Sequence, residues 1–381
     1  MGDASDLEQL RKTARDFCER ELKPGARDRD RSETFPAELI PKMAAVGFLG
    51  ATFPEELGGM GLDAHGYQIV MEELGAADSS MRSTTSVNVG LVGGSIMRWG
   101  TDEQRREWLP RLAAGELGAF GLTEPGAGSN PSQMTSRARR DGDDWVIDGQ
   151  KIFISNGTVG AVTMVFARAV DGDDDRGITC FLVPQDSPGY EGRQIHGKLG
   201  LRAGDTAEIF LEEVRVPGET VLGDLGGGMK LALSALDDGR FSLASACVGI
   251  ARESLEVSVR YATEREQFGK PIASYQLVQE MLADMHVDAT AGRALCEKVA
   301  VKKESGERYT LESSTAKLFC TEAAVRCADR AVQVHGGYGY IDEYPVQRLL
   351  RDARVTTLYE GTSQIQKLLL GRHLTGVNAF A

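Results

Sequence analysis

The stretch Asp143–Gly157, DDWVIDGQKIFISNG, decides the fold class because it interrupts a chain that otherwise has mostly helical patterns. Asp148–Gly149 lies between two short runs of β-forming residues, and this dipeptide is typical of a two-residue hairpin turn. We therefore predict a hairpin there. The runs VTMVFARA, GITCFLVP and AEIFLEEVRVP follow, each bounded by Gly, Pro or Asp, and predict further strands. Residues 119–224 are expected to form a small all-β domain.

Helical spacing dominates on both sides of this region. Apolar residues recur on one helical face from Leu7 to Phe17, and Pro24 is expected to stop that helix. PAELIPKMAAVGFL and HGYQIVMEELGAAD repeat the pattern before residue 118. After Gly226–Gly228, three longer helical patterns extend to residue 337, enough chain for an antiparallel helix bundle. The predicted fold class is α+β, with an N-terminal helical domain at 1–118, a middle β-barrel or sandwich at 119–224 and a C-terminal four-helix bundle at 225–381.

The composition argues against several classes of function. A net charge of −13 disfavours a partner with a phosphate backbone, so nucleic acid is not expected. No segment approaches the roughly eighteen consecutive apolar residues that a membrane span needs. The six cysteines form no C-x-x-C pair and the five histidines no H-x-x-x-H pair, so no metal site is predicted. Met1–Asp6 carries no basic and then apolar targeting pattern, which predicts a cytoplasmic location.

A glycine-rich turn, FGLTEPGAGSN at Phe120–Asn130, opens the β region. Taken alone, it is either a surface loop or a backbone that offers its amides and hydroxyls to a ligand. It is not a G-x-G-x-x-G opening a βαβ unit, so a Rossmann nucleotide site is not supported.

Five further segments occur in order with this turn: FISNG at Phe153–Gly157, KLGLRAGDTAE at Lys198–Glu208, YATEREQFGKPIASYQ at Tyr261–Gln276, QVHGGYGY at Gln333–Tyr340 and LYEGTSQIQ at Leu358–Gln366. Together the six segments resemble the acyl-CoA dehydrogenase family over essentially the whole chain. The resemblance implies the α, β, α fold of that family, FAD as cofactor and a homotetramer built as a dimer of dimers.

The resemblance also implies which residues bind FAD. The flavin end is expected to contact the first two motifs, at Phe120, Gly121, Leu122, Thr123, Ser129, Phe153, Ile154 and Ser155. Phe153 and Ser155 stand where many relatives have Trp and Thr, which keeps a stacking ring and a hydroxyl. The adenine and pyrophosphate end is expected to be held partly by the neighbouring subunit, through Arg265, Phe268, Gln276, Gln333, Val334, His335, Gly336 and Gly337. Further contacts are implied for Thr362, Ser363 and Gln364.

Arg265 suits a pyrophosphate because its planar guanidinium donates two hydrogen bonds at once. From the local sequence alone, it could equally be one more charge on a solvated helix between Glu264 and Glu266. The two glycines of QVHGG could let backbone approach a cofactor or simply end a helix. Only the shared register of the six motifs favours the cofactor.

LDDGR at Leu236–Arg240 is the candidate substrate segment. The resemblance implies that Asp237 and Arg240 contact the CoA portion, with Asp238 and Gly239 beside them, while Ser129 and the backbone of Gly361 hold the thioester end. A minority of the family places its catalytic Glu immediately before this Arg. This chain has Gly239 there, so the base is sought in the C-terminal motif.

Glu360 occupies the family's usual catalytic position, in LYEGT. The implied reaction is α,β-dehydrogenation of an acyl thioester, in which one carboxylate takes the α-proton while flavin accepts the β-hydride. Acyl-CoA is therefore the expected substrate, and electron-transfer flavoprotein the expected electron acceptor. Two other classes stay open: an acyl-CoA oxidase or carrier-protein acyl dehydrogenase, and a non-catalytic thioester-binding flavoprotein.

Overall fold

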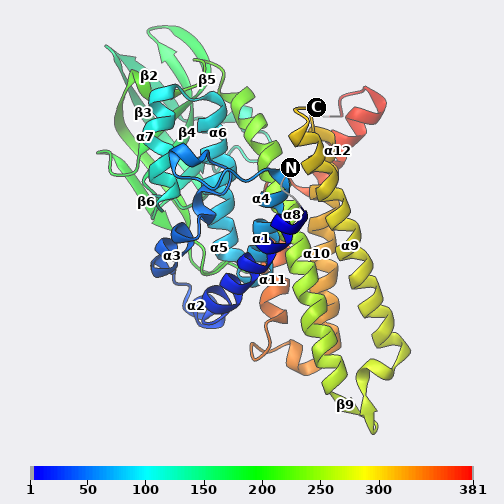
Figure 1. Cartoon of the computed structure of the whole chain (residues 1–381). Helices are drawn as coiled ribbons and strands as arrows, with labels where there is room; N and C mark the ends of the chain where they lie inside the picture. The colour runs from blue at the N-terminus through cyan, green and yellow to red at the C-terminus, as the bar shows by residue number, and fades with distance from the viewer. Residues whose placement is uncertain (1–3, 380–381) are drawn as a thin grey trace.

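The computed structural model describes residues 4–379. Helices form its N-terminal region (Figure 1). They are α1 (Ala4–Phe17), the π-helix η1 (Cys18–Leu22), α2 (Ala26–Ser32), α3 (Ile40–Ala45), α4 (Ala64–Ala77), α5 (Ser79–Thr85), the π-helix η5 (Ser86–Gly93), α6 (Gly94–Trp99) and α7 (Asp102–Ala113). The first predicted helix is confirmed and ends before Pro24. Met1, Gly2 and Asp3, for which no targeting pattern was expected, lie outside the described residues.

The segment PAELIPKMAAVGFL does not form the single helix that its spacing predicts. It divides into the 3-10 turn η2 (Ala37–Leu39), helix α3 and the 3-10 turn η3 (Phe48–Gly50). Pro41 lies in the first turn of α3, where a proline is tolerated. Gly47 has a φ of +79° in the left-handed region, which ends the helix.

The middle region is a mixed sheet of eight strands. They are β1 (Gly118–Gly121), β2 (Arg137–Asp141), β3 (Asp144–Ser155), β4 (Val162–Asp171), β5 (Asp174–Pro184), β6 (Tyr190–Gln194), β7 (Thr206–Pro217) and β8 (Val221–Leu222). The order is β6-β7-β3-β2-β4-β5-β8, with β1 parallel to β4. The predicted strands are confirmed, but the sheet is not closed into a barrel.

The predicted hairpin at Asp148–Gly149 is wrong. Strand β3 runs straight through this dipeptide, and the turn before it lies at Asp141–Asp144 instead. Asp148 Oδ1 accepts a hydrogen bond from the Glu213 amide at 2.8 Å, and the register shifts between Ile147 and Gly149. A β-carbon on Gly149 would lie 2.2 Å from Ser136 Oγ, so glycine here permits a close crossing at a β-bulge.

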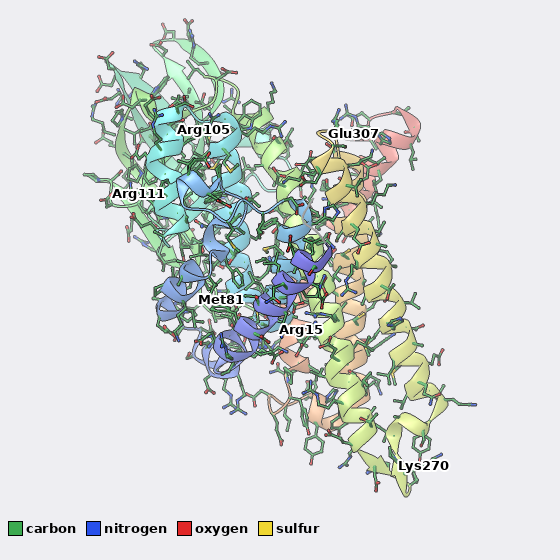
Figure 2. All side chains as sticks on the ribbon, viewed as in Figure 1. Arg15, Met81, Arg105, Arg111, Lys270 and Glu307 are labelled. Atoms are coloured by element: carbon green, nitrogen blue, oxygen red, sulfur yellow. The ribbon has the colours of Figure 1, made fainter. Side chains whose placement is uncertain are left out.

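The C-terminal region consists of long helices and their shorter partners. They are α8 (Gly228–Glu264), α9 (Gln276–Glu304), α10 (Thr310–His335), α11 (Val346–Thr356) and α12 (Ser363–Thr375). Helices α8, α9 and α10 lie side by side (Figure 1). Glu307 and Lys270 mark opposite ends of this bundle (Figure 2).

Helix α4 packs unusually close to α8. A β-carbon on Gly249 would lie 1.9 Å from the Glu72 carbonyl oxygen, and one on Gly75 would lie 2.2 Å from the Ala246 carbonyl oxygen. The two glycines therefore let the backbones of α4 and α8 touch. One apolar core extends from α1 through this contact to α11. The two helical regions therefore share a core, although the sheet region separates them in the sequence.

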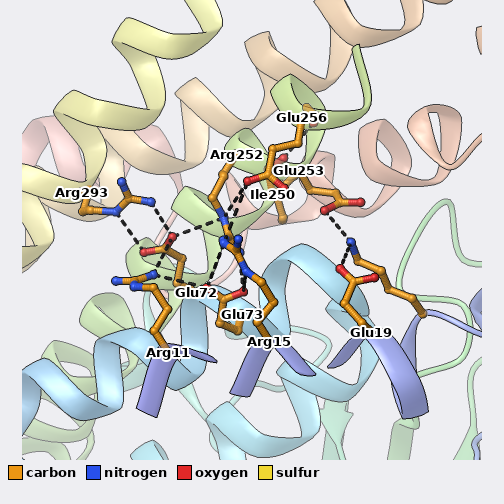
Figure 3. A network of polar contacts seen from close by, with 12 residues as sticks. Arg11, Arg15, Glu19, Glu72, Glu73, Ile250, Arg252, Glu253, Glu256 and Arg293 are labelled. Carbon is orange, nitrogen blue, oxygen red and sulfur yellow. Dashed lines mark hydrogen bonds and ion pairs between the residues drawn. The ribbon is translucent and has the colours of Figure 1, made fainter. Parts of the chain in front are cut away.

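A network of buried charges lies where the two helical regions meet (Figure 3). Glu72 and Glu73 of α4 are 0% and 2% exposed. Four arginines from α1, α8 and α9 surround these two carboxylates: Arg11, Arg15, Arg252 and Arg293. Arg252 Nη2 lies 2.6 Å from Glu73 Oε2, and Arg293 Nη2 lies 2.6 Å from Glu72 Oε1. The network ties the N-terminal helix to the bundle.

Among residues 4–379, no helix combines the length and the hydrophobicity that a membrane span needs. Within the same residues, no group of three or more His, Cys, Asp or Glu side chains is arranged to hold a metal ion.

Candidate active site

Glu360 lies in the short loop between α11 and α12. Its φ is +57° and that of Gly361 is +83°, so two consecutive residues adopt the left-handed conformation. The loop is closed by the Ser363 amide, which donates to the Thr357 carbonyl at 3.0 Å. Thr362 then caps α12 by accepting from the Ile365 amide at 3.2 Å. This turn directs the Glu360 side chain toward α8.

The Glu360 carboxyl group faces Gly239 of α8. A β-carbon on Gly239 would lie 2.6 Å from Glu360 Oε2 and 2.7 Å from Oε1. Oε2 is buried and has no hydrogen-bond partner among the described residues. An enclosed carboxylate oxygen with no donor is costly to ionise, and it is free to act on another molecule.

Burial raises the pKa of Glu360 to about 7, against the opposing influence of Arg240, Lys317 and Arg82. The desolvation of the carboxylate is therefore only partly offset by three nearby cations. A pKa near neutrality suits a general base that works at physiological pH.

Two arginines bracket the Glu360 loop. Arg82 of α5 is 1% exposed, and its Nη2 donates to the Tyr359 hydroxyl at 2.8 Å. Arg240 Nε donates to the Glu360 carbonyl at 3.2 Å, and its Nη1 pairs with Asp237 at 2.8 Å. One arginine thus holds the side chain of the preceding residue, and the other holds the backbone carbonyl of Glu360 itself.

Asp237, which is expected to contact CoA, and Asp238 beside it already have partners within the chain. Asp237 accepts from Thr310 Oγ1 at 2.6 Å as well as from Arg240. Asp238 pairs with Lys303 and accepts from the Tyr309 hydroxyl. These contacts join both acids of α8 to the end of α9 and the start of α10.

In the sheet, the structure brings the first two motifs side by side. The Ile152 amide donates to the Thr123 carbonyl at 3.0 Å, which aligns the glycine-rich turn with β3. Phe153 is 66% exposed and has a φ of +61°, so its ring projects from the bulged end of β3. Ser129 is exposed, whereas Thr123 and Ser155 are half-buried. The arrangement offers an uncovered aromatic ring and hydroxyl groups to a planar ligand.

A buried ion pair fixes the glycine-rich turn. Glu124 is 3% exposed, and its carboxylate accepts from Lys151 Nζ at 2.7 Å. It also accepts from the Thr135 amide at 2.6 Å, the Thr135 hydroxyl at 2.8 Å and the Ser136 amide at 3.0 Å. Because the acid is adjacent to Thr123, this pair holds the turn rigidly against β3.

Several of the residues predicted to hold the adenine and pyrophosphate end of FAD line a cavity. It lies at the end of the bundle marked by Lys270. The cavity holds about 440 Å³, and its walls include Arg265, Val334, His335, Gly336 and Gly337. Phe268 and Gln333 adjoin lining residues in sequence, and these two residues and Gln276 are exposed, Phe268 by 94%. No carboxylate within the described residues forms a salt bridge with Arg265. Its guanidinium lies 5.7 Å from the centre of the Tyr338 ring.

This cavity and the Glu360 loop lie far apart in one chain. Gly239 and Glu264 are about 25 residues apart on α8, which at 1.5 Å per residue separates them by roughly 38 Å. Lys270, next to the cavity end of α8, lies at the opposite end of the molecule from the sheet (Figure 2). The predicted residues therefore form two separate sets within one copy of the chain.

Comparisons with known proteins identify the family. Three family models match consecutive parts of the chain: "Acyl-CoA dehydrogenase, N-terminal domain" at residues 4–116, "middle domain" at 119–214 and "C-terminal domain" at 226–375. The chain belongs to the acyl-CoA dehydrogenase family. It is therefore an oxidoreductase of the acyl-CoA dehydrogenase class.

Individual relatives agree over nearly the whole chain. The mouse mitochondrial short-chain specific acyl-CoA dehydrogenase is 41% identical, covering 96% of this chain and 89% of the relative. A Mycobacterium smegmatis glutaryl-CoA dehydrogenase in complex with FADH2 is 40% identical, with a TM-score of 0.95 over 100% of this chain and 97% of that one. A chain from a structure on the electron transferring flavoprotein of Acidaminococcus fermentans is 38% identical, with a TM-score of 0.95 over 98% and 99%.

The residues of this acyl-CoA dehydrogenase fit FAD. Gly336 and Gly337 have open space where a β-carbon would lie, so a ligand can approach their backbone. Arg265 supplies an exposed cation at the same cavity, as a pyrophosphate requires. The exposed Phe153 ring offers a stacking surface at the end of β3, where the flavin end is expected.

Several residues around Glu360 were missed in the sequence of this acyl-CoA dehydrogenase. Lys317 and Gln366, both 0% exposed, donate to the backbone of the Glu360 loop. Arg82 was missed as well. A signal existed for Lys317, because helical spacing places it on one face with Ser313 and Cys320, both buried. A lysine on a buried helix face is rare unless it has a partner, so this spacing was a usable signal.

Proposed function

We propose that this acyl-CoA dehydrogenase catalyses the α,β-dehydrogenation of an acyl-CoA thioester, with Glu360 as the base that removes the α-proton. The observation that carries the proposal is the buried, unpartnered Oε2 of Glu360 opposite Gly239. A carboxylate so enclosed, with its pKa raised to about 7 by burial, is poised to exchange a proton with a bound substrate.

FAD, when bound, supplies the acceptor for the hydride that leaves the β-carbon. Thr123, Phe153 and Ser155 are the residues that would hold its ring. Glu124 and Lys151 would keep Thr123 in place, because their ion pair fastens the turn to β3.

The adenine and pyrophosphate end of the same FAD would contact a neighbouring subunit through Arg265 and Gly336–Gly337. The separation of roughly 38 Å along α8 between Gly239, which faces Glu360, and Glu264 at the cavity end supports this assignment. Exposed apolar side chains near the cavity, Phe268 at 94%, Leu277 at 74% and Tyr340 at 86%, support an assembly that covers this end of the bundle. We propose a homotetramer, built as a dimer of dimers.

On the substrate side, Arg240 and Asp237 would receive the CoA portion, next to Asp238 and Gly239. Ser129 and the backbone of Gly361 would contact the thioester. The Glu360 amide would donate to the thioester oxygen as negative charge develops there, and the left-handed backbone of Glu360–Gly361 gives this amide its orientation. Thr362, Ser363 and Gln364 would complete the loop beside the cofactor.

Electrons would leave for an electron-transfer flavoprotein, and the enzyme would work in the cytoplasm. The relative from the Acidaminococcus electron transferring flavoprotein structure supports the first assignment. The composition of the chain, with 41% apolar and 26% charged residues, supports the second.

The test is anaerobic bleaching of the bound flavin by a panel of short, medium, branched, dicarboxylic and aromatic acyl-CoAs. Rapid bleaching by at least one of them is expected. No bleaching by any acyl-CoA, but bleaching by an acyl carrier-protein thioester, would assign the enzyme to carrier-bound substrates. Peroxide formation in air at the rate of bleaching would make it an oxidase. A yellow protein that no thioester bleaches would be a non-catalytic flavoprotein.

A further inference from the structure

The backbone of Glu360 is in a conformation that it would not hold alone. A non-glycine residue in the left-handed region is strained and persists only when its surroundings fix it. Glu360 has a φ of +57°, and the carbonyls of Glu360 and Gly361 are both turned toward the bundle. The structure must therefore contain groups that hold these two carbonyls.

Three side chains from three helices do so. Gln366 Nε2 of α12 donates to the Glu360 carbonyl at 2.9 Å and the Gly361 carbonyl at 3.1 Å. Arg240 Nε of α8 donates to the Glu360 carbonyl at 3.2 Å. Lys317 Nζ of α10 donates to the Gly361 carbonyl at 2.8 Å.

Lys317 differs from the other two because stability does not explain its charge. It is 0% exposed, and within residues 4–379 no carboxylate forms a salt bridge with it. An apolar residue of similar length would fill the same space without the cost of desolvating an ammonium group. Its described hydrogen bond goes to a backbone carbonyl one residue from the base.

We infer that Lys317 is a positioning residue of this enzyme, whose ammonium group holds the Gly361 carbonyl and thereby the left-handed turn that aims Glu360 at the substrate. The inference rests on the proposed role of Glu360 as the base. It adds a residue that touches neither substrate nor reacting atoms and acts through the backbone of the base.

The charge of Lys317 has a second effect on the same site. Together with Arg240 and Arg82 it lowers the pKa of Glu360, against the burial that raises it. The other titratable groups that influence this carboxylate are Asp237 of α8, which raises its pKa, and Tyr67 of α4 and Tyr359, whose own pKa values it raises. Burial lowers the pKa of Lys317 itself to about 8, so its charge acts on Glu360 below that pH. Removing this charge should therefore make Glu360 a base that ionises at a higher pH.

The test compares Lys317→Met, which removes donor and charge, with Lys317→Gln, which keeps an amide donor. Lys367→Met is the control, because Lys367 is exposed on α12 near the same loop. The rate of anaerobic flavin reduction should fall by about 10²-fold in Lys317→Met, as a small misplacement of a catalytic group does, with KM changed far less. Lys317→Gln should recover most of this rate at high pH. The control should match the parent.

A pH profile separates positioning from a merely structural role. In both Lys317 variants the rise of the rate with pH, and the titration of the Glu360 carboxyl followed by carbon NMR of labelled glutamate, should move to higher pH than in the parent. Unchanged rates and an unchanged titration in Lys317→Met would overturn the inference. If Lys317→Met loses FAD or melts at a lower temperature than the parent, Lys317→Gln replaces it in the test. The pH dependence of its rate and the titration of its Glu360 carboxyl then decide whether the inference holds.

Failure of this inference is distinct from failure of the proposed function. If Glu360→Gln still reduces flavin at the parental rate, Glu360 is not the base and the role of Lys317 falls with it. If Glu360→Gln is inactive while both Lys317 variants behave like the parent, only the inference about Lys317 fails.

Discussion

Gly239 and Glu360 face each other so closely that a β-carbon on Gly239 would lie 2.6 Å from the carboxylate. Gly239 lies inside α8, where alanine is favoured over glycine by about 1 kcal/mol. Glycine at this position therefore costs helix stability and leaves room for the side chain of the base.

This contact predicts opposite effects on stability and activity. Gly239→Ala should leave the melting temperature unchanged or raise it, because the helix gains, while flavin reduction falls by roughly 10²-fold because Glu360 is displaced. Gly371→Ala is the matched control, since its β-carbon would enter open space on α12. It should gain stability and keep full activity. Full activity in Gly239→Ala would mean that the carboxylate works from another position.

Replacing the base tests the reaction directly. Glu360→Gln should keep the yellow colour of bound FAD, yet lose flavin reduction by about 10²–10⁴-fold or more, the range typical of a positioned general base. Stopped-flow absorbance of the flavin under anaerobic conditions measures this rate. Reduction at a near-normal rate would contradict the assignment.

The raised pKa of Glu360 predicts two pH dependences. Because the base must be ionised, kcat/KM should rise as the pH passes through about 7. Folding favours the protonated carboxyl, so ionised Glu360 costs stability that grows from pH 4.5 to 7 and reaches at most about 3 kcal/mol above pH 7. Glu360→Gln should thus melt higher than the parent at pH 8 but not at pH 4.5, as calorimetry can check. Equal melting temperatures at pH 8 would mean that the folded and unfolded pKa values agree.

Arg265 should matter for cofactor retention rather than for folding. Arg265→Ala removes the cation at the cavity and should weaken FAD binding, which is measured by flavin release on gel filtration. Arg260→Ala, an exposed arginine one turn earlier on α8, should retain FAD like the parent. Unchanged FAD affinity in Arg265→Ala, or a fully FAD-loaded monomer, would contradict the contact across subunits.

The buried charge network predicts a large loss of stability from a single deletion. Glu73→Ala leaves Arg252, which is 9% exposed, without its 2.6 Å partner and should cost about 3–5 kcal/mol of unfolding free energy. Glu103→Ala breaks an exposed pair with Arg106 on α7 and should cost about 0–1 kcal/mol. Chemical denaturation of both variants measures the difference. A cost below 1 kcal/mol for Glu73→Ala would mean that the network contributes little.

The sequence predicts the helical and sheet regions because periodicity and turn residues are local signals. It misplaces the hairpin at Asp148–Gly149 because a glycine that permits a close crossing, here with Ser136, has the same local signature as one that makes a turn. The sequence points to Glu360 because this residue occupies the family's usual catalytic position in the LYEGT motif. It does not yield Lys317 or Arg82, because their roles depend on which carbonyl or hydroxyl lies opposite them, and that is decided by helix packing.

The contact between α4 and α8 has a consequence for how the chain folds. Glu73 and Arg252 are 179 residues apart in sequence, and the whole sheet region is made between them. In topological terms the sheet is an insertion into one discontinuous helical unit. The N-terminal helices therefore cannot complete their core during synthesis until α8 and α9 have emerged. Until then the glycine face of α4 remains uncovered, and its two acids have only the arginines of α1 as partners.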